Sequence, residues 1–197
     1  MRTLDFWFDY SCPYAYLAST QVEALANRTG ARLIYRPMLL GGVFAANGTP
    51  QKLFATLSAA KAAHNERDLD RWARLWGVPL AMPAGHPLRT VEALRATVAS
   101  GVDPRVVQAF YRAYWVDGRG PSEEATMRDV LTAAGHDPAP LLEAIARPEA
   151  KDDLRRRTDE AIGLGIFGAP AFVVDGENMY WGQDRMHFVE RDLLGRE

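Results

Sequence analysis

A strand, a turn, a helix and a second strand follow one another at the start of this sequence, and this order constrains the fold most. Residues 3–10 are rich in aromatic side chains and predict a strand that is buried on both faces. Residues 13–27 carry apolar side chains at helical spacing, with Pro13 at the first position and Gly30 after the end. Residues 31–38 alternate and predict the second strand. Together they predict a βαβ unit.

The middle of the chain favours helices, separated by breaks that contain glycine and proline. The predicted helices cover residues 52–76, 91–100, 104–115, 122–134, 138–146 and 148–164. Beyond them, residues 171–174 and 179–181 predict two strands joined by a turn, and residues 183–194 predict a closing helix.

The order βαβ, helical block, ββα predicts an α/β protein with a thioredoxin-like fold and an all-helical insertion. Residues 1–45 and 166–197 are the expected thioredoxin-like domain. Residues 46–165 are the expected insertion, including the helix that returns to the sheet.

Composition narrows the range of functions. The chain is 48% hydrophobic and 24% charged, which is enough apolar material for a full core. A net charge of −2 gives no reason to expect nucleic acid or an anionic membrane as partner. Uncharged apolar stretches are too short to span a bilayer, and Asp5 and Asp9 interrupt any signal-peptide core. One cysteine cannot form an internal disulfide, so we expect a cytoplasmic protein.

Cys12, the single cysteine, lies where the first predicted strand turns into the first predicted helix. Free backbone N–H groups and the helix dipole favour an anion at a helix start. The position therefore predicts either a stabilised thiolate on Cys12 or a bound thiolate from a cofactor. A lone cysteine can equally be a small buried apolar residue, and the spacing alone does not decide between these interpretations.

Pro170 stands at the entrance of a predicted late strand, where proline removes a hydrogen-bond donor from the sheet. A cis peptide bond between Ala169 and Pro170 would turn the backbone of Ala169 toward a ligand instead of the sheet. The alternative is a trans proline that begins an edge strand.

Several short motifs together resemble one family. They are Asp9-x-x-Cys12-Pro13-Tyr14-x-Tyr16-Leu17, Arg71-Trp72-Ala73, Gly77-Val78-Pro79-Leu80, Phe167-Gly168-Ala169-Pro170 and Trp181-Gly182-Gln183-Asp184-Arg185. The set spans nearly the whole chain and is similar to 2-hydroxychromene-2-carboxylate isomerases, which belong with kappa-class glutathione transferases and DsbA-type oxidoreductases. The resemblance implies a thioredoxin domain with a helical insertion, glutathione as cofactor, and a homodimer.

At the centre of the site the chain departs from both patterns of this family. The isomerase-like members have a serine immediately before the proline, and its hydroxyl stabilises the glutathione thiolate. Cys12 occupies that position here. The oxidoreductases have a second cysteine at the position of Ala15, so Cys12 cannot close an internal disulfide in this motif. The resemblance therefore implies that Cys12 is catalytic as the companion of glutathione's thiolate.

The resemblance also assigns cofactor-binding residues. Pro170 matches the family's cis proline, and the backbone of Ala169 would pair with the cysteinyl part of glutathione. Gln183 and Asp184 follow Trp181 and match residues that hold the γ-glutamyl end, where a carboxylate suits the ammonium group. From the residues alone, Asp184 could instead satisfy the first turn of its own helix.

The expected substrate-binding residues are Lys61, His64 and Tyr14. Lys61 resembles a family lysine that faces the active site from the first insertion helix. Lys61, His64 and Arg71 recur at helical spacing, and a basic face suits a carboxylate of the substrate or of glutathione. The family often has tyrosine where this chain has His64, and the face could equally be solvated.

Other candidates carry less chemistry. Trp72 and Trp76, four residues apart on a predicted helix, are expected in the core. His86 could line the pocket or be an ordinary polar loop residue. The remaining histidines have no metal-like spacing with Cys12, and we expect no metal site.

The resemblance implies a glutathione-dependent isomerase that acts on a small aromatic hydroxy- or keto-acid by reversible thiol addition. One alternative is a DsbA-like monothiol oxidoreductase that forms a mixed disulfide through Cys12. A kappa-type transferase that conjugates glutathione to electrophiles is a second, and a protein that only binds a ligand or partner is a third.

Overall fold

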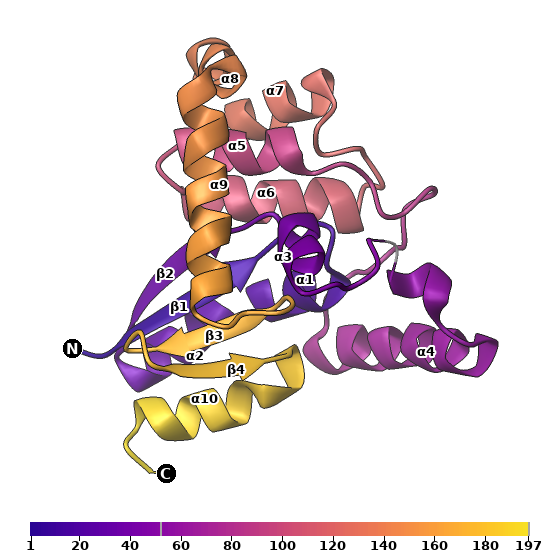
Figure 1. Ribbon diagram of the computed structural model, residues 1–197, viewed down its shortest axis with the longest axis vertical. Helices are drawn as coiled ribbons and strands as arrows, with labels where there is room; N and C mark the ends of the chain where they lie inside the picture. The colour runs from indigo at the N-terminus through magenta and orange to yellow at the C-terminus, as the bar shows by residue number, and fades with distance from the viewer. Residues whose placement is uncertain (52, 197) are drawn as a thin grey trace.

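A four-stranded mixed sheet forms the centre of the molecule, with strand order β2-β1-β3-β4 (Figure 1). The computed structural model describes residues 1–51 and 53–196. β1 pairs in parallel with β2 and antiparallel with β3, and β4 continues antiparallel at the edge. The strands are β1 Thr3–Phe8, β2 Arg32–Pro37, β3 Ala171–Val174 and β4 Asn178–Trp181.

β1 is a central strand because it is apolar on both faces, as the sequence predicts. Phe6, Trp7 and Phe8 are all fully buried. Phe6 and Phe8 stack with 5.6 Å between ring centroids, and Phe6 also contacts Phe172 on β3 at 5.5 Å. Each such side chain contributes about 1.5–3 kcal/mol through burial, so β1 anchors the sheet that carries the site.

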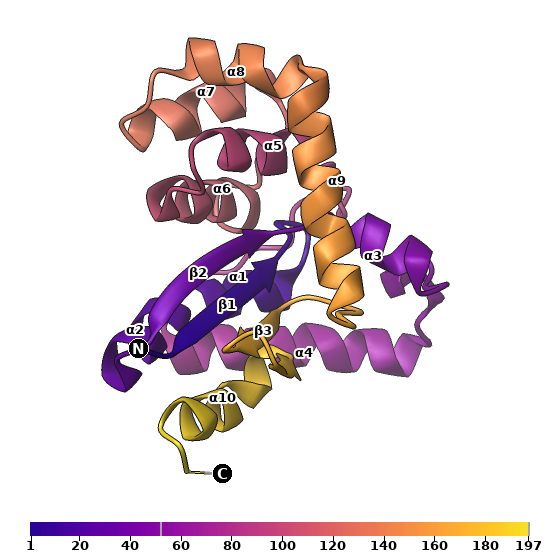
Figure 2. The ribbon, with the colours of Figure 1, turned by 60° about the vertical axis from the view of Figure 1, so that its left-hand side comes forward.

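Helices surround the sheet (Figures 1 and 2). Their bounds are α1 Pro13–Ser19, α2 Val22–Thr29, α3 Leu40–Ala46, α4 Ala59–Trp76, α5 Val91–Ala99, α6 Pro104–Trp115, α7 Glu124–Ala133, α8 Pro138–Ala146, α9 Pro148–Gly163 and α10 Met186–Leu193, with 3-10 turns η1 Leu53–Thr56 and η2 Gln183–Arg185. The block α5–α8 lies above the sheet in Figure 1, and α9 runs down from it toward β3. Helix α10 lies below the sheet, and α4 crosses the lower right.

The order of elements is the predicted one, but several boundaries differ. The predicted helix over residues 13–27 is two helices, α1 and α2. The hydroxyl of Ser19 donates to the carbonyl of Tyr16, and that of Thr20 donates to the carbonyl of Leu17, each at 2.7 Å. These hydroxyls occupy carbonyls that would otherwise accept backbone N–H groups of a continuing helix. This competition explains why α1 ends before α2 begins.

Two further boundaries differ in the insertion. Of the helix predicted over residues 52–76, Lys52 lies outside the described residues, and α4 begins only at Ala59. The hydroxyl of Ser58 accepts from the backbone N–H of Lys61, which caps the helix start. The sequence did not predict α3, and the expected domain boundary between residues 45 and 46 falls inside this helix. The division into two domains stays a prediction.

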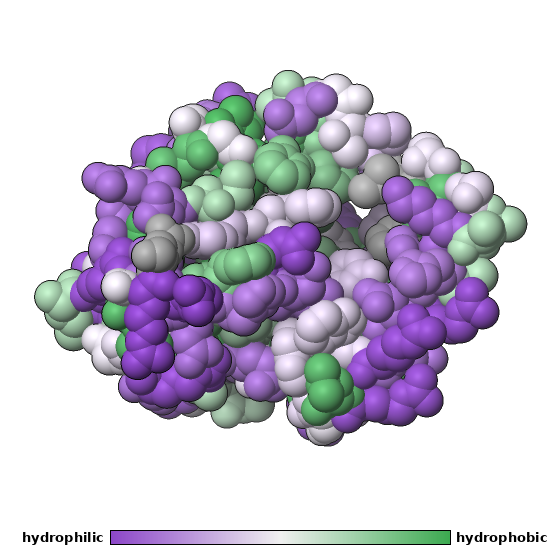
Figure 3. All heavy atoms as spheres, turned by 90° about the horizontal axis from the view of Figure 1, so that it is seen from below, coloured by the Kyte–Doolittle hydropathy of each residue, from purple (hydrophilic) through white to green (hydrophobic). Residues whose placement is uncertain are grey.

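The face seen from below in Figure 1 carries mainly hydrophilic side chains, with hydrophobic ones in small separate groups (Figure 3). Among the described residues, no helix combines the length and the apolar character needed to cross a bilayer.

Candidate active site

Cys12 lies at the N-cap position of α1, directly after the turn that leaves β1. Its backbone N–H donates to the carbonyl of Asp9 at 3.2 Å, and its own carbonyl accepts from Tyr16 at 3.0 Å. The side chain is only 8% exposed, and its Sγ–H donates to the carbonyl of Ala169 at 3.0 Å. Two predicted motifs that are 157 residues apart therefore meet at one hydrogen bond.

Burial raises the pKa of the Cys12 thiol to about 12, which favours its protonated form. The N–H groups of Ala15 and Tyr14 at the helix start lower this pKa, and the charge of Asp9 raises it, but loss of solvation is the largest effect. Burial thus favours the uncharged thiol over the thiolate interpretation, and the role of Cys12 stays a prediction. A helix start favours an anion only where the group keeps enough contact with water or with charge partners.

The peptide bond between Ala169 and Pro170 is cis, as the resemblance implies. The β1–β3 pairing ends where Trp7 faces Ala171, so Ala169 lies just outside the sheet. Within the described part of the chain, the N–H of Ala169 donates to no acceptor, and its carbonyl accepts only from Cys12. The backbone of Ala169 is thus available to pair with a peptide-like ligand.

An exposed aromatic pair flanks this loop. Phe167 and Trp181 are 43% and 50% exposed, and their ring centroids lie 5.0 Å apart. A Cβ atom at Gly168 would come within 2.6 Å of Nε1 of Trp181, so only glycine allows the loop to pack this closely against the indole. Trp181, a predicted cofactor-binding residue, therefore lies against the loop that carries Ala169.

Tyr14, on the first turn of α1, connects several candidates. Burial raises the pKa of its hydroxyl to about 12, with further contributions from the negative charges of Asp68 on α4, Cys12 and Asp184. Asp68 is the largest of these charge contributions. The structure thus brings Cys12, Asp68 and Asp184 near Tyr14. Asp68 was not among the expected site residues, although its position between Lys61 and Arg71 on one helix face was a signal.

Gln183 and Asp184 lie in η2, where the chain turns from β4 into α10. Gln183 is buried, and Asp184 forms an ion pair with Arg185 at 2.8 Å. Both residues line a pocket of about 230 Å³ between α2, α4 and α10. Its other lining residues are Gln21, Arg28, Trp72, Trp76, Met186, His187 and Glu190.

Trp72 and Trp76 are only partly buried, with ring centroids 4.9 Å apart, and they form one wall of this pocket. The expectation that both belong to the core is therefore incomplete. Their helical spacing correctly predicts that they share a face of α4. It does not predict that this face meets η2 and α10 across a pocket, because that depends on how α4 lies against the rest of the chain.

Lys61 and His64 are exposed on the first turns of α4. In the residues that the structure describes, no hydrogen bond or ion pair joins either side chain to Cys12, Ala169 or Asp184. Lys61 and Asp68 are seven positions apart, which places them on the same face of α4, about 10 Å apart along the helix. The role of Lys61 and His64 in substrate binding stays a prediction.

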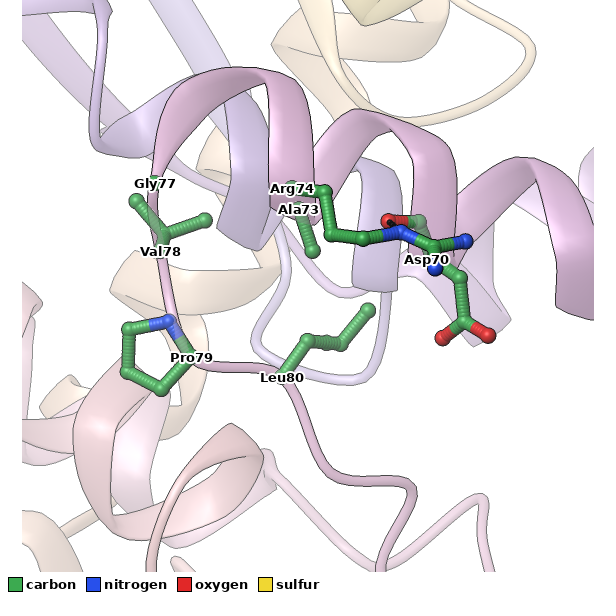
Figure 4. Close-up of a pocket in the computed structure, with 7 residues that line it drawn as sticks. All are labelled: Asp70, Ala73, Arg74, Gly77, Val78, Pro79 and Leu80. Carbon is green, nitrogen blue, oxygen red and sulfur yellow. Dashed lines mark hydrogen bonds between the residues drawn. The ribbon is translucent and has the colours of Figure 1, made fainter.

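A larger hollow of about 750 Å³ lies at the carboxyl end of α4 and contains none of the predicted site residues. Figure 4 shows Asp70, Ala73 and Arg74 on the helix above the segment from Val78 to Leu80. Nε of Arg74 donates to the carbonyl of Asp70 at the edge of this hollow. The contacts of Cys12, and not this hollow, locate the candidate site.

His86 lies in the loop before α5, also beside a cis proline, Pro87. Its Nδ1 lies 2.8 Å from the hydroxyl of Tyr114, and its ring packs against Trp115. Burial lowers its pKa to about 4, so the imidazole is neutral near pH 7. These contacts hold the loop in place. Among the described residues, no group of three or more metal-ligating side chains could hold an ion.

Comparisons with known proteins agree with this geometry. A family model described as a DSBA-like thioredoxin domain matches residues 3–194. A 2-hydroxychromene-2-carboxylate isomerase of Sphingobium xenophagum is 32% identical over 98% of this chain and 98% of its own length. Glutathione S-transferase kappa 1 of Caenorhabditis elegans is 29% identical over 97% of this chain and 90% of its own.

A solved structure of a 2-hydroxychromene-2-carboxylate isomerase matches with a TM-score of 0.87 and 28% identity, over 98% of this chain and 95% of that chain. The match confirms the predicted thioredoxin-like fold with a helical insertion. The chain belongs to the DSBA-like thioredoxin domain family, and its relatives there include 2-hydroxychromene-2-carboxylate isomerases and kappa glutathione transferases.

Proposed function

We propose that this protein is a glutathione-dependent isomerase of the 2-hydroxychromene-2-carboxylate type, which interconverts the cis and trans forms of a small aromatic hydroxy- or keto-acid. The hydrogen bond from Cys12 Sγ to the carbonyl of Ala169, at 3.0 Å, carries this proposal. It places a buried, protonated donor next to a free backbone N–H at the cis proline. The names of the relatives supply the reaction class.

The residues around Cys12 fit a glutathione molecule. The unpaired N–H of Ala169 suits the backbone of a cysteinyl residue in an extended peptide. Asp184 and the side chain of Gln183 suit the ammonium and carboxylate groups of a γ-glutamyl end. When bound, glutathione would supply a thiol that adds reversibly to a conjugated carbon, turning a double bond into a single bond that can rotate.

Cys12 would act here as a hydrogen-bond donor. Its S–H already donates to the carbonyl of Ala169, and a small rotation would turn the same proton toward a neighbouring sulfur anion. S–H is a weaker donor than the serine hydroxyl that related isomerases have at this position. The raised pKa of Cys12 suits this role, since two adjacent thiolates would repel one another.

The other residues would position the substrate. Tyr14 keeps its proton near pH 7 and can donate a hydrogen bond to an oxygen of the acid. Lys61 and His64, exposed on α4, would attract the substrate carboxylate. Phe167 and Trp181 offer exposed aromatic faces beside Ala169, and ring stacking of an aromatic acid there would add about 0.5–1.5 kcal/mol.

A monothiol oxidoreductase is the main rival, because Ala15 occupies the position of a second cysteine and excludes a dithiol mechanism. The burial of Cys12 disfavours this rival. A thiol with a pKa of about 12 is almost entirely protonated near pH 7, whereas thiol–disulfide exchange requires a thiolate. Since one cysteine suits a reducing compartment, a cytoplasmic location belongs to the same proposal. So does the homodimer, which light scattering during gel filtration would test.

The direct test follows the absorbance of 2-hydroxychromene-2-carboxylate with the purified protein, with and without glutathione. We expect turnover that requires glutathione. Absence of turnover above background under both conditions would contradict the proposal. Two parallel assays separate the rivals: conjugation of a generic aryl halide would indicate a transferase, and a glutathione adduct on Cys12 after treatment with oxidised glutathione would indicate an oxidoreductase.

A further inference from the structure

Asp9 is a buried carboxylate that the proposed chemistry does not use. It lies at the end of β1, three residues before Cys12, and is 1% exposed. Burial raises the pKa of this carboxyl group, so its position costs stability unless hydrogen bonds compensate. The structure supplies polar contacts to Asp9 from three segments: the Cys12 turn, the start of α3 and the start of α5.

The first segment is the Cys12 turn itself. Oδ1 of Asp9 accepts from the backbone N–H of Ser11 at 2.9 Å and from its hydroxyl at 3.0 Å. The carbonyl of Asp9 accepts from the N–H of Cys12 at 3.2 Å. Side chain and backbone of one residue therefore fix the two positions that precede α1.

The second and third segments are helix starts that lack caps of their own. The N-cap residue of α3 is Leu39, which has no polar side chain, and Oδ2 of Asp9 accepts from the next N–H, that of Leu40, at 2.8 Å. The N-cap residue of α5 is Thr90, whose buried hydroxyl makes no bond to its own helix. That hydroxyl lies near the carboxylate of Asp9 and lowers its pKa. Each helix start would otherwise carry buried unpaired groups.

We propose that Asp9 is a positioning residue that holds the Cys12 turn, α3 and α5 in one arrangement and so keeps the Cys12 thiol against the carbonyl of Ala169. The helical insertion is thereby coupled to the thiol: α5 opens the block of helices above the sheet, and α3 leads toward α4. Loss of the carboxylate leaves the N–H and hydroxyl of Ser11 and the N–H of Leu40 without their acceptor. The turn then loosens, and Cys12 becomes accessible.

Alkylation of Cys12 tests this directly, because Cys12 is the single cysteine and each adduct counted by intact-mass spectrometry reports on it alone. We expect Asp9→Ala to raise the rate of alkylation by iodoacetamide at mildly alkaline pH about tenfold. Asp9→Asn keeps one carbonyl oxygen and should give an intermediate rate. The assay needs neither glutathione nor substrate, so it is independent of whether the proposed isomerase function holds.

Asp5→Asn is the matched control. Asp5 is a carboxylate on the same strand, 7% exposed, and its partner is Arg36 at 3.1 Å. This variant should lose stability without changing the alkylation rate. Equal alkylation rates in wild type, Asp9→Asn and Asp9→Ala would overturn the proposal, as would an equal rise in Asp5→Asn.

Thr90→Val provides a second test in case the Asp9 variants fail to fold, which a non-cooperative melting curve would reveal. This variant removes the hydroxyl beside Asp9 and leaves Asp9 in place. We therefore expect a smaller rise in the alkylation rate than in Asp9→Ala. An unchanged rate in Thr90→Val would then overturn the proposal.

Discussion

At the scale of single residues, burial decides the chemistry of Cys12. The motif around Cys12 correctly predicts its place at the start of α1 and near the cis proline. The motif alone cannot decide whether the Cys12 thiol is ionised, because the pKa of the thiol depends on how completely the surrounding residues exclude water. Tyr111 of α6, itself fully buried, is close enough for the charges of the two groups to interact. That contact joins residues 99 positions apart in the sequence and leaves no local pattern.

Substitutions at Cys12 distinguish whether this residue acts as a hydrogen-bond donor or as a nucleophile. We expect Cys12→Ser to retain glutathione-dependent isomerase activity or raise it, since a hydroxyl is a stronger donor than a thiol. Cys12→Ala removes the donor and should lower kcat/KM about tenfold or more. Steady-state kinetics at saturating glutathione measure both effects. Loss of all activity in Cys12→Ser would show that the sulfur itself reacts, and wild-type activity in Cys12→Ala would remove Cys12 from the mechanism.

At the scale of elements, the strands and the longer helices were predictable because hydrophobic spacing and caps lie within each segment. β1 and α6 fall close to their predicted bounds, with Pro104 at the first position of α6 and Asp103 capping it. α3 was not predictable. Gly41 and Gly42 lower its helix propensity, and the carboxylate at its first turn is that of Asp9, 31 residues away. A cap supplied from a distant strand cannot be read from local sequence.

The loop before α5 should make stability depend on pH through His86. The folded protein favours neutral His86, with a pKa of about 4, while the unfolded chain binds the proton below about 6.5. The stabilising contribution is therefore complete above pH 6.5 and is lost as pH falls from about 6.5 toward about 4. Because the ring is only partly buried, we expect a loss of roughly 1–2 kcal/mol.

Urea unfolding across this pH range measures the effect. The variant His86→Gln should unfold with a smaller change in free energy between the two ends of the range than wild type. His187→Gln, at an exposed histidine on α10, is the matched control and should follow wild type. Identical pH dependence in wild type and His86→Gln would show that His86 does not titrate with unfolding.

At the scale of the whole molecule, the candidate site is assembled from both ends of the chain. Cys12 and Tyr14 come from α1, Ala169 from the loop before β3, and Asp184 from η2 after β4. The sheet brings these together because β1 and β3 are neighbours. The family motifs name these residues as a set, and their role in binding stays a prediction. The pocket beside Trp72 was not predictable, since it depends on the placement of α4 against α2 and α10.

Because the site joins segments that are far apart in sequence, glutathione should bind the folded state and not the unfolded chain. It should therefore raise the melting temperature of the protein. At a concentration about 100 times Kd, the free energy of unfolding rises by about 2.7 kcal/mol. For a chain of this length that corresponds to a rise in Tm of about 5–10 °C. S-methylglutathione lacks the thiol, so its smaller shift would measure what the contact with Cys12 adds.

Asp184→Asn should reduce the shift with glutathione by removing the carboxylate that faces the ammonium group. Asp129→Asn, which breaks an exposed ion pair with Arg119 away from the site, is its control and should leave the shift unchanged. A shift with glutathione but no turnover would favour a binding protein over an enzyme. Absence of any shift, with Asp184→Asn and wild type alike, would mean that glutathione is not the ligand, whatever Cys12 does.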